Sequence, residues 1–170
     1  FNSHALRYLL AILPLLFLLS MVGCEPKDEV VTNDPSAMLR FSADTVLFDT
    51  VFVTQGSVTR RLKVYNPNKN AVRISSINLA GANSSPYKLI VNGLESPVVS
   101  NLELRGKDSL YILVSVNVNP ANQNLPFLVA DSILFNTNGN QQNVKLVAYG
   151  QDAVFHHKGV IGNTTWSAGK

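Results

Sequence analysis

The most reactive side chain of this sequence is that of Cys24, the single cysteine among 170 residues. A thiolate is a nucleophile, so this side chain can accept an alkyl or acyl group. Cys24 ends a segment that begins near Arg7 and continues through an apolar run over 9–19 to the small residue Gly23. A basic start, an apolar stretch of about 7 to 15 residues and a small-residue exit are typical of an export signal. With one thiol the chain can form no internal disulfide, so the stability of its fold must come from packing.

The segment 19–24, Leu-Ser-Met-Val-Gly-Cys, resembles the lipobox of bacterial lipoproteins. The resemblance implies that residues 1–23 are a cleaved lipoprotein signal peptide and that Cys24 carries diacylglycerol and an added fatty acid such as palmitate. The apolar run is short for a transmembrane helix, which needs about 20 residues. Two or more acyl chains hold a protein durably on a membrane. The alternative, a buried cysteine acting as a small hydrophobe, does not account for the residues on either side.

The residues that follow Cys24 are polar and predict a flexible tether over 24–38. Within it, Lys27, Asp28 and Glu29 resemble the lysine-plus-acidic export signal of Bacteroidetes lipoproteins that reach the outer face of the outer membrane. The resemblance implies a lipid-anchored outer-membrane protein at the cell surface. The alternative is a charged linker on a periplasm-facing anchor, because three residues match easily by chance.

Eight segments have the composition and alternation of β-strands. They are 45–53, 61–65, 71–79, 87–91, 98–104, 109–118, 128–135 and 143–149. Turn residues separate them, including the Asn-Pro-Asn-Lys-Asn segment 66–70 and Asn-Gly pairs at 92–93 and 138–139. We therefore expect an all-β fold over 39–151, an antiparallel immunoglobulin-like β-sandwich of seven or eight strands.

Alternation also predicts details of two strands. In 61–65 it places Leu62 and Val64 inward and Arg61, Lys63 and Tyr65 outward. The basic residues of this strand then lie on a solvated face. The turn 66–70 is expected to close a hairpin with the strand 71–79. In that strand the alternation slips, which predicts a bulge near 75–76.

The order of motifs resembles the hydin-like and abnormal-spindle-like immunoglobulin modules. The resemblance lies in Arg-Leu-Lys-Val-Tyr-Asn-Pro from residue 61, Asp-Ser-Leu-Tyr-Ile from 108, Asp-Ser-Ile-Leu-Phe from 131 and Lys-Leu-Val-Ala-Tyr-Gly from 145. It covers about residues 39–151, and the chain lacks the Cys-Trp-Cys core of antibody domains. Residues 152–170 are expected to be a linker or the start of a further module in a longer protein.

Four sites read aspartate, then serine or threonine, then an aliphatic residue, which resembles the O-glycosylation sequon of exported Bacteroidetes proteins. The candidate acceptors are Thr45, Thr50, Ser109 and Ser132. The alternative is that strands begin this way, with a turn aspartate before β-forming residues. Intact-mass measurement of natively purified protein distinguishes the two.

We find no constellation that predicts catalysis, a cofactor or a metal site. His156 and His157 are adjacent, so on an extended backbone they point to opposite faces. No phosphate loop, calcium loop or nucleophile motif is present. The formal net charge of +3, without a clustered basic stripe, argues against a nucleic-acid binder.

The sequence thus predicts a membrane-anchored envelope protein, not an enzyme, whose sandwich serves as a spacer or as a binding module for an unidentified glycan or protein. One alternative is the accessory domain of a larger carbohydrate-active enzyme. Another is a glycan-binding protein with exposed aromatic residues, for which Tyr65, Tyr87, Tyr111 and Trp166 are the candidates.

Overall fold

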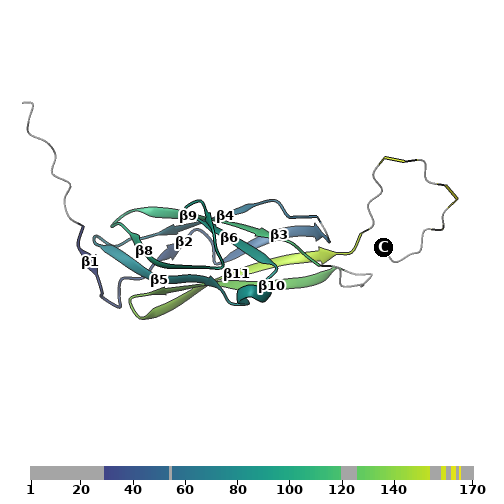
Figure 1. Ribbon diagram of the computed structural model, residues 1–170. Coiled ribbons are helices and arrows are strands. Elements are labelled where there is room, and N and C mark those ends of the chain that lie inside the picture. Colours follow the sequence, from purple (N-terminus) through teal and green to yellow (C-terminus); the bar gives the residue numbers. More distant parts are fainter. Residues whose placement is uncertain are drawn as a thin grey trace, which may run out of the picture.

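The computed structural model describes residues 29–53, 55–119, 126–153, 158–159, 162–163 and 165. Two β-sheets pack face to face and form a sandwich, as the sequence predicts (Figure 1). The six-stranded sheet contains β1 (Val31–Thr32), β3 (Thr45–Phe52), β5 (Ala71–Leu79), β8 (Val98–Leu104), β10 (Phe127–Thr137) and β11 (Asn140–Gln151). The five-stranded sheet contains β2 (Arg40–Phe41), β4 (Arg60–Tyr65), β6 (Tyr87–Val91), β7 (Leu94–Glu95) and β9 (Ser109–Val116).

The order of strands follows from the register of their pairing. In the six-stranded sheet β3, β11, β10, β5 and β8 lie side by side, and β1 pairs with β5 beside the end of β10. In the five-stranded sheet the order is β2, β4, β9, β6 and β7. A short 3-10 helix, η1 (Ala82–Ser84), lies in the loop before β6. No helix in the described part of the chain is long and apolar enough to cross a membrane.

The core lies between the sheets and is built from residues that alternate along each strand. In β9 the inward residues are Leu110, Ile112, Val114 and Val116, all buried as the alternation predicts. Phe48 and Phe135 are its largest fully buried side chains. Burying such side chains stabilises a fold by about 1.5–3 kcal/mol each, which provides stability without a disulfide.

Several local predictions are confirmed. Leu62 and Val64 are fully buried, while Arg61 and Tyr65 are exposed. The bulge expected near 75–76 is present, because Thr137 pairs with Ile74 and Asn136 with Ser76, so Ser75 is skipped. Both Asn-Gly turns adopt positive φ angles, +50° and +80° at 92–93 and +50° and +79° at 138–139. These turns connect β6 to β7 and β10 to β11 as antiparallel hairpins.

The hairpin expected around 66–70 does not form. β4 belongs to the five-stranded sheet and β5 to the six-stranded sheet, so this turn carries the chain across the sandwich. Its residues meet the β8–β9 turn instead, where Lys107 N donates to Asn68 O at 3.0 Å. Turn chemistry identifies where a strand ends, but it does not say which sheet the next strand joins.

Two strand pairs are parallel in a sandwich that is otherwise antiparallel. β2 pairs antiparallel with β4, and after residues 42–44 the chain continues in the other sheet as β3, parallel to β11. β1 is parallel to β5. The segment from β2 to β3 therefore passes from one sheet to the other. It pairs with β4 in the first sheet and with β11 in the second, and so covers part of an edge of each sheet.

The N-terminal segment 29–38 packs on the sandwich, although the sequence analysis places it in the flexible tether. The main chain of Val31–Thr32 pairs with β5, and Ala37 is 5% exposed. The side-chain amides of Asn138 and Asn140 donate to the carbonyl oxygens of Asp34 and Pro35. The ordered region therefore begins before the predicted boundary at residue 39.

Candidate binding surface on the outer face of β4 and β9

The outer faces of β4 and β9 bring two basic and two aromatic residues together. In the antiparallel ladder Arg61 lies opposite Leu113, Lys63 opposite Tyr111, and Tyr65 opposite Ser109. The inward residues of both strands fill the core, so period two directs these side chains outward. We call Arg61, Lys63, Tyr65, Tyr111 and Leu113 the basic tyrosine face.

The cations of this face lie against the tyrosine rings. The Arg61 guanidinium carbon is 4.9 Å from the centre of the Tyr111 ring. Lys63 Nζ is 4.9 Å from the Tyr65 ring centre and 5.3 Å from that of Tyr111. Exposed cation–π contacts contribute only about 0.5–1 kcal/mol, so they orient the basic groups without neutralising them. Tyr65 and Tyr111 are 37% and 45% exposed, so a ligand can reach both rings.

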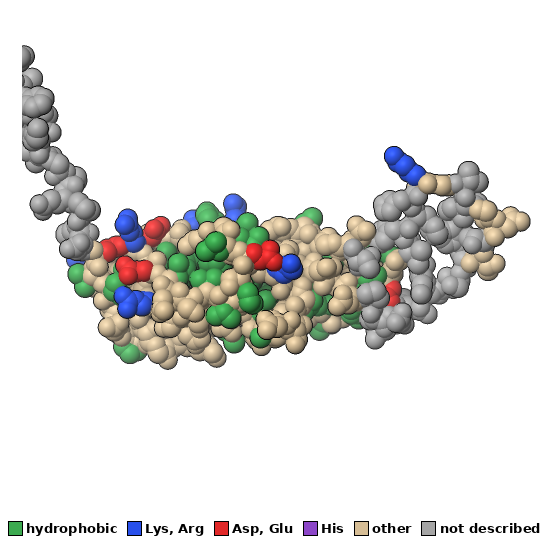
Figure 2. All heavy atoms as spheres, viewed as in Figure 1, with side chains coloured by type: hydrophobic (Ala, Val, Ile, Leu, Met, Phe, Trp, Pro, Cys, Tyr) green, Lys and Arg blue, Asp and Glu red, His purple; other side chains and the backbone are tan. Residues whose placement is uncertain are grey.

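No carboxylate among the described residues forms an ion pair with Arg61 or Lys63. The ion pairs there are Arg73 with Glu103, Lys88 with Glu95, and Arg105 with Glu29. Figure 2 shows acidic and basic side chains lying next to one another on the side of the sandwich facing the viewer, and basic side chains projecting from its upper edge, over β4 and β9. The basic tyrosine face is therefore a positive surface whose charges are free to meet an anion.

Two depressions adjoin this face. The first has a volume of about 480 Å³ and its lining includes Arg61, Asn92, Ser109 and Tyr111. The second, of about 470 Å³, is lined in part by Arg40, Tyr65, Lys107 and Asp108. Tyr65, which lines the second depression, lies opposite Ser109, which lines the first. Arg61 therefore lines one depression, and Arg40 and Lys107 line the other.

The aromatic candidates from the sequence divide into two groups. Tyr65 and Tyr111 lie together on the face, but Tyr87 is 2% exposed and belongs to the core. Its hydroxyl donates to Val129 O at 2.8 Å, and burial, followed by the negative charge of Asp131, raises the pKa of Tyr87 well above its usual range. Trp166 lies outside the described residues. The glycan-binding interpretation thus loses Tyr87 because its inward position on β6 makes it a core residue.

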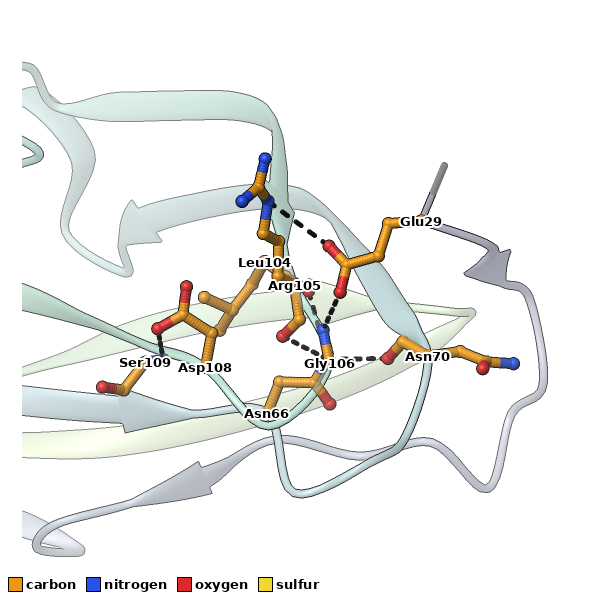
Figure 3. Close-up of polar contacts among 8 residues, drawn as sticks. All are labelled: Glu29, Asn66, Asn70, Leu104, Arg105, Gly106, Asp108 and Ser109. Atoms are coloured by element: carbon orange, nitrogen blue, oxygen red, sulfur yellow. Dashed lines mark hydrogen bonds and ion pairs between the residues drawn. The ribbon is translucent and has the colours of Figure 1, made fainter. Parts of the chain in front are cut away.

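A second polar cluster lies at the end of the sandwich where the N-terminal segment packs (Figure 3). Glu29 Oε1 accepts a hydrogen bond from Gly106 N at 2.9 Å, and its Oε2 is 3.4 Å from Arg105 Nε. Of the predicted export residues, Glu29 is therefore docked on the β8–β9 turn. Cys24, Lys27 and Asp28 lie outside the described residues, as do His156 and His157.

Asn66 is the buried centre of the same cluster. Its Nδ2 lies 2.9 Å from Asn70 O, 3.1 Å from Leu104 O and 3.0 Å from Arg105 O (Figure 3). Its Oδ1 accepts hydrogen bonds from Asn68. Asn66 thus joins the β4–β5 turn to the β8–β9 turn and fixes the surface on which Glu29 docks.

The β8–β9 turn also depends on Gly106. A Cβ atom added there would lie 2.0 Å from the carbonyl oxygen of Lys69. Only glycine permits this approach of the two turns.

The four candidate glycosylation sites are dispersed over the sandwich. Thr50 is exposed, and Thr45, Ser109 and Ser132 are partly exposed. In three of the motifs the aspartate Oδ1 accepts a hydrogen bond from the N–H of the next residue, at 2.8 Å for Thr50 and 2.7 Å for Ser109 and Ser132. These local bonds are what turn and strand-start aspartates make without modification.

In the described part of the chain, no group of three or more histidine, cysteine, aspartate or glutamate residues is placed to hold a metal ion. Four residues that line the two depressions were not predicted from the sequence, because they lie on strands or turns other than β4. They are Arg40, Ile90, Lys107 and Leu113. The alternation in 109–118 could have placed Tyr111 and Leu113 outward, but the pairing of β4 with β9 was not predictable from local patterns.

No protein-family model matches the chain, and a search of curated proteins found no match. Among solved structures, a PapD-like domain of human CEP192, also called an ASH domain, is 10% identical, with a TM-score of 0.45 over 78% of this chain and 97% of that one. A protein of unknown function from Porphyromonas gingivalis is 13% identical, with a TM-score of 0.48 over 67% of this chain and 48% of that one. The Escherichia coli chaperone DraB is 14% identical, with a TM-score of 0.42 over 70% of this chain and 55% of that one. The chain thus spans about half the length of the last two.

Proposed function

We propose that this chain is a lipid-anchored protein of the bacterial cell envelope whose immunoglobulin-like sandwich is a spacer and a binding module. The basic tyrosine face is the observation that carries the binding role, because it joins exposed aromatic rings to cations that form no ion pair with any described carboxylate. Tyrosine and arginine are enriched where proteins bind partners tightly. The lipid anchor rests on Cys24 and the residues before it.

The docked N-terminal segment limits the distance between the lipid and the domain. From Cys24 to Glu29 the chain has five residue steps, which span at most about 18 Å when fully extended. Were residues 29–38 free as well, the reach from Cys24 to Leu39 would be about 54 Å over fifteen steps. The contacts of Glu29 and β1 therefore hold the β8–β9 turn near the membrane.

The sandwich then acts as a rigid spacer. β1 and the end of β11 lie at opposite ends of the molecule (Figure 1). β11 has twelve residues, which corresponds to about 40 Å along the strand. A partner or module attached after β11 would thus be held about 40 Å beyond the docked N-terminal segment. The basic tyrosine face lies on the side of this spacer and can be reached without moving either end.

The anchor is tested by Cys24→Ser in the native host. The wild-type chain should partition with membranes after a high-salt wash and take up labelled palmitate. The variant should lose the label and enter the soluble fraction. A variant that stays with washed membranes and is still cleaved would overturn the lipid anchor.

We further propose that the protein is displayed on the cell surface, on the basis of Lys27, Asp28 and Glu29. Protease treatment of intact cells should then remove the domain, while a periplasmic control protein survives. If the domain survives on intact cells and is degraded after lysis, the anchor faces the periplasm. Charge reversal at Lys27 and Asp28 provides the matched variant, since it changes the export signal and leaves Glu29 with its contacts to the β8–β9 turn.

A further inference from the structure

We infer that the basic tyrosine face binds a polysaccharide that carries carboxylates. The inference rests on the proposed function, since it names the ligand class of the same surface. Three properties of the face support it: the charge, the length, and the pairing of the β9 main chain on both sides beneath the tyrosine rings.

The charge of the face selects an anion. Arg61, Lys63, Arg40 and Lys107 lie on or beside it, and none of them is in an ion pair with a carboxylate of the described residues. Among the described residues that line either depression, Asp108 is the one carboxylate; it lines the second, and its Oδ1 already accepts a hydrogen bond from Ser109 N. A guanidinium matches the two oxygens of a carboxylate with parallel hydrogen bonds, so Arg61 favours a carboxylate over a spherical anion.

The length of the face selects a polymer. From Arg61 to Tyr65 the strand advances by about 13 Å. The second depression extends this path past Tyr65 to Arg40 and Lys107. The first widens it beside Tyr111 as far as Asn92, which follows the last β6 residue paired with β9. A small anion would use one cation, whereas a chain with repeated carboxylates can meet Arg61, Lys63 and the far pair at once. The exposed ring faces of Tyr65 and Tyr111 lie between these charges and suit the apolar C–H faces of sugar rings.

The backbone of the face disfavours a peptide. Beneath the face, the β9 main chain pairs with β4 on one side and with β6 on the other. On its far side β4 pairs with β2 only at Val64 and Tyr65, so its remaining backbone groups face the sheet edge and do not lie under the tyrosine rings. A peptide strand binds best at a sheet edge, where free N–H and C=O groups can bond it. Laid across this face, its amides would lie against tyrosine rings without partners, which is unfavourable. Sugar hydroxyls and carboxylates can instead bond side chains and water.

The test measures binding of the full chain, purified in detergent, to immobilised alginate, hyaluronate and polygalacturonate, with neutral dextran and poly-L-glutamate as comparison ligands. We expect at least one carboxylated polysaccharide to bind, and dextran and poly-L-glutamate to bind at least about tenfold more weakly. Affinity should fall several-fold in high salt, because exposed charges are screened.

A matched pair of double variants locates the site. Arg61→Gln with Lys63→Gln should lower the affinity at least about tenfold, and Tyr111→Leu several-fold. Arg73→Gln with Lys145→Gln removes the same charges from the outer face of the other sheet and should change it less than about twofold. Equal thermal midpoints of the two double variants show that the loss is not a loss of fold.

The outcomes separate the ligand class from the binding role. If none of the three acidic polysaccharides binds, or if both double variants weaken binding equally, the inference is overturned. If poly-L-glutamate binds as tightly as the polysaccharides and depends on Arg61 and Lys63, the ligand is an acidic peptide and the inference fails while the binding module stands. If the Cys24→Ser chain, which cannot carry the lipid, binds isolated cell envelopes equally well with and without Arg61→Gln and Lys63→Gln, the binding role of the face itself fails.

Discussion

Replacing Asn66 with alanine is expected to destabilise the sandwich by about 3 kcal/mol. Asn66 is 1% exposed, and its Nδ2 lies within 3.1 Å of three carbonyl oxygens. Two N–H groups can serve two of these oxygens at a time, and Oδ1 accepts a bond from Asn68 N at 3.0 Å. Three such bonds at about 1 kcal/mol each give the estimate. The buried Leu104 carbonyl, left without this partner, could add about 1 kcal/mol more.

Urea and thermal unfolding measure this loss. A change of 3 kcal/mol is a large fraction of the roughly 5–15 kcal/mol that stabilises a native domain. For a domain of this size it should lower the thermal midpoint by about 10 °C. Asn143→Ala is the control, because Asn143 is exposed on β11 and should change stability by less than about 0.5 kcal/mol. A loss below about 1 kcal/mol in Asn66→Ala would refute the role assigned to the Asn66 cluster.

A second substitution separates lost bonds from lost volume. Asn66→Asp keeps the shape but turns a carboxylate toward the carbonyl oxygens of Asn70, Leu104 and Arg105. Repulsion and burial raise the pKa of the new carboxyl in the folded state, so the protein loses stability as the pH rises above the unfolded value of about 4. The variant should therefore be closer to wild-type stability at pH 4 than at pH 7. A deficit that does not change with pH would mean that the site takes up water and does not impose these contacts.

Two further predictions concern other buried or docked groups. Tyr87→Phe should cost about 1 kcal/mol at neutral pH, through the lost bond to Val129 O. Burial raises the pKa of Tyr87 in the folded state, so the stability of the wild-type protein should fall as the pH rises above about 10, where the unfolded tyrosine ionises. A series of urea midpoints at increasing pH measures this fall, and the part of it due to Tyr87 should be absent from Tyr87→Phe. Glu29→Gln removes an ion pair with Arg105 that is largely exposed, so global stability should change by less than about 1 kcal/mol. Amide exchange over 29–38 should nevertheless become several-fold faster, and unchanged exchange there would contradict the docking role of Glu29.

Local patterns in the sequence predicted the strands well but not their partners. The alternation in 61–65 determined which side chains of β4 face inward, because only one register buries Leu62 and Val64. The Asn-Gly turns determined two hairpins, because their positive φ angles require such residues. The 66–70 turn was misjudged because its residues close a hairpin or a crossover equally well. What decides between them is the long-range contact of Asn66 with the β8–β9 turn.

For the basic tyrosine face as well, the direction of the side chains was predictable from the sequence and the pairing of the strands was not. Alternation predicted that Arg61, Lys63 and Tyr65 point outward, but a single strand with two basic residues is indistinguishable from an ordinary solvated face. The pairing of β4 with β9 changes this, since it brings Tyr111 beside Lys63. Packing of the N-terminal segment could not be predicted from local patterns either, because the Asn138 and Asn140 side chains that bond it lie more than a hundred residues along the chain.

The distribution of charge gives the binding interpretation its strongest physical support. The three glutamates of the described residues, Glu29, Glu95 and Glu103, all lie in ion pairs with bases at the β1, β7 and β8 side of the sandwich. A surface selected only for solubility would mix both signs over every face. On β4 and β9 the outward side chains include Arg61 and Lys63 but no carboxylate. Two cations held against tyrosine rings, with Asp108 at the margin as the carboxylate described there, form a surface that repels cations and retains an anion that is long enough to contact both.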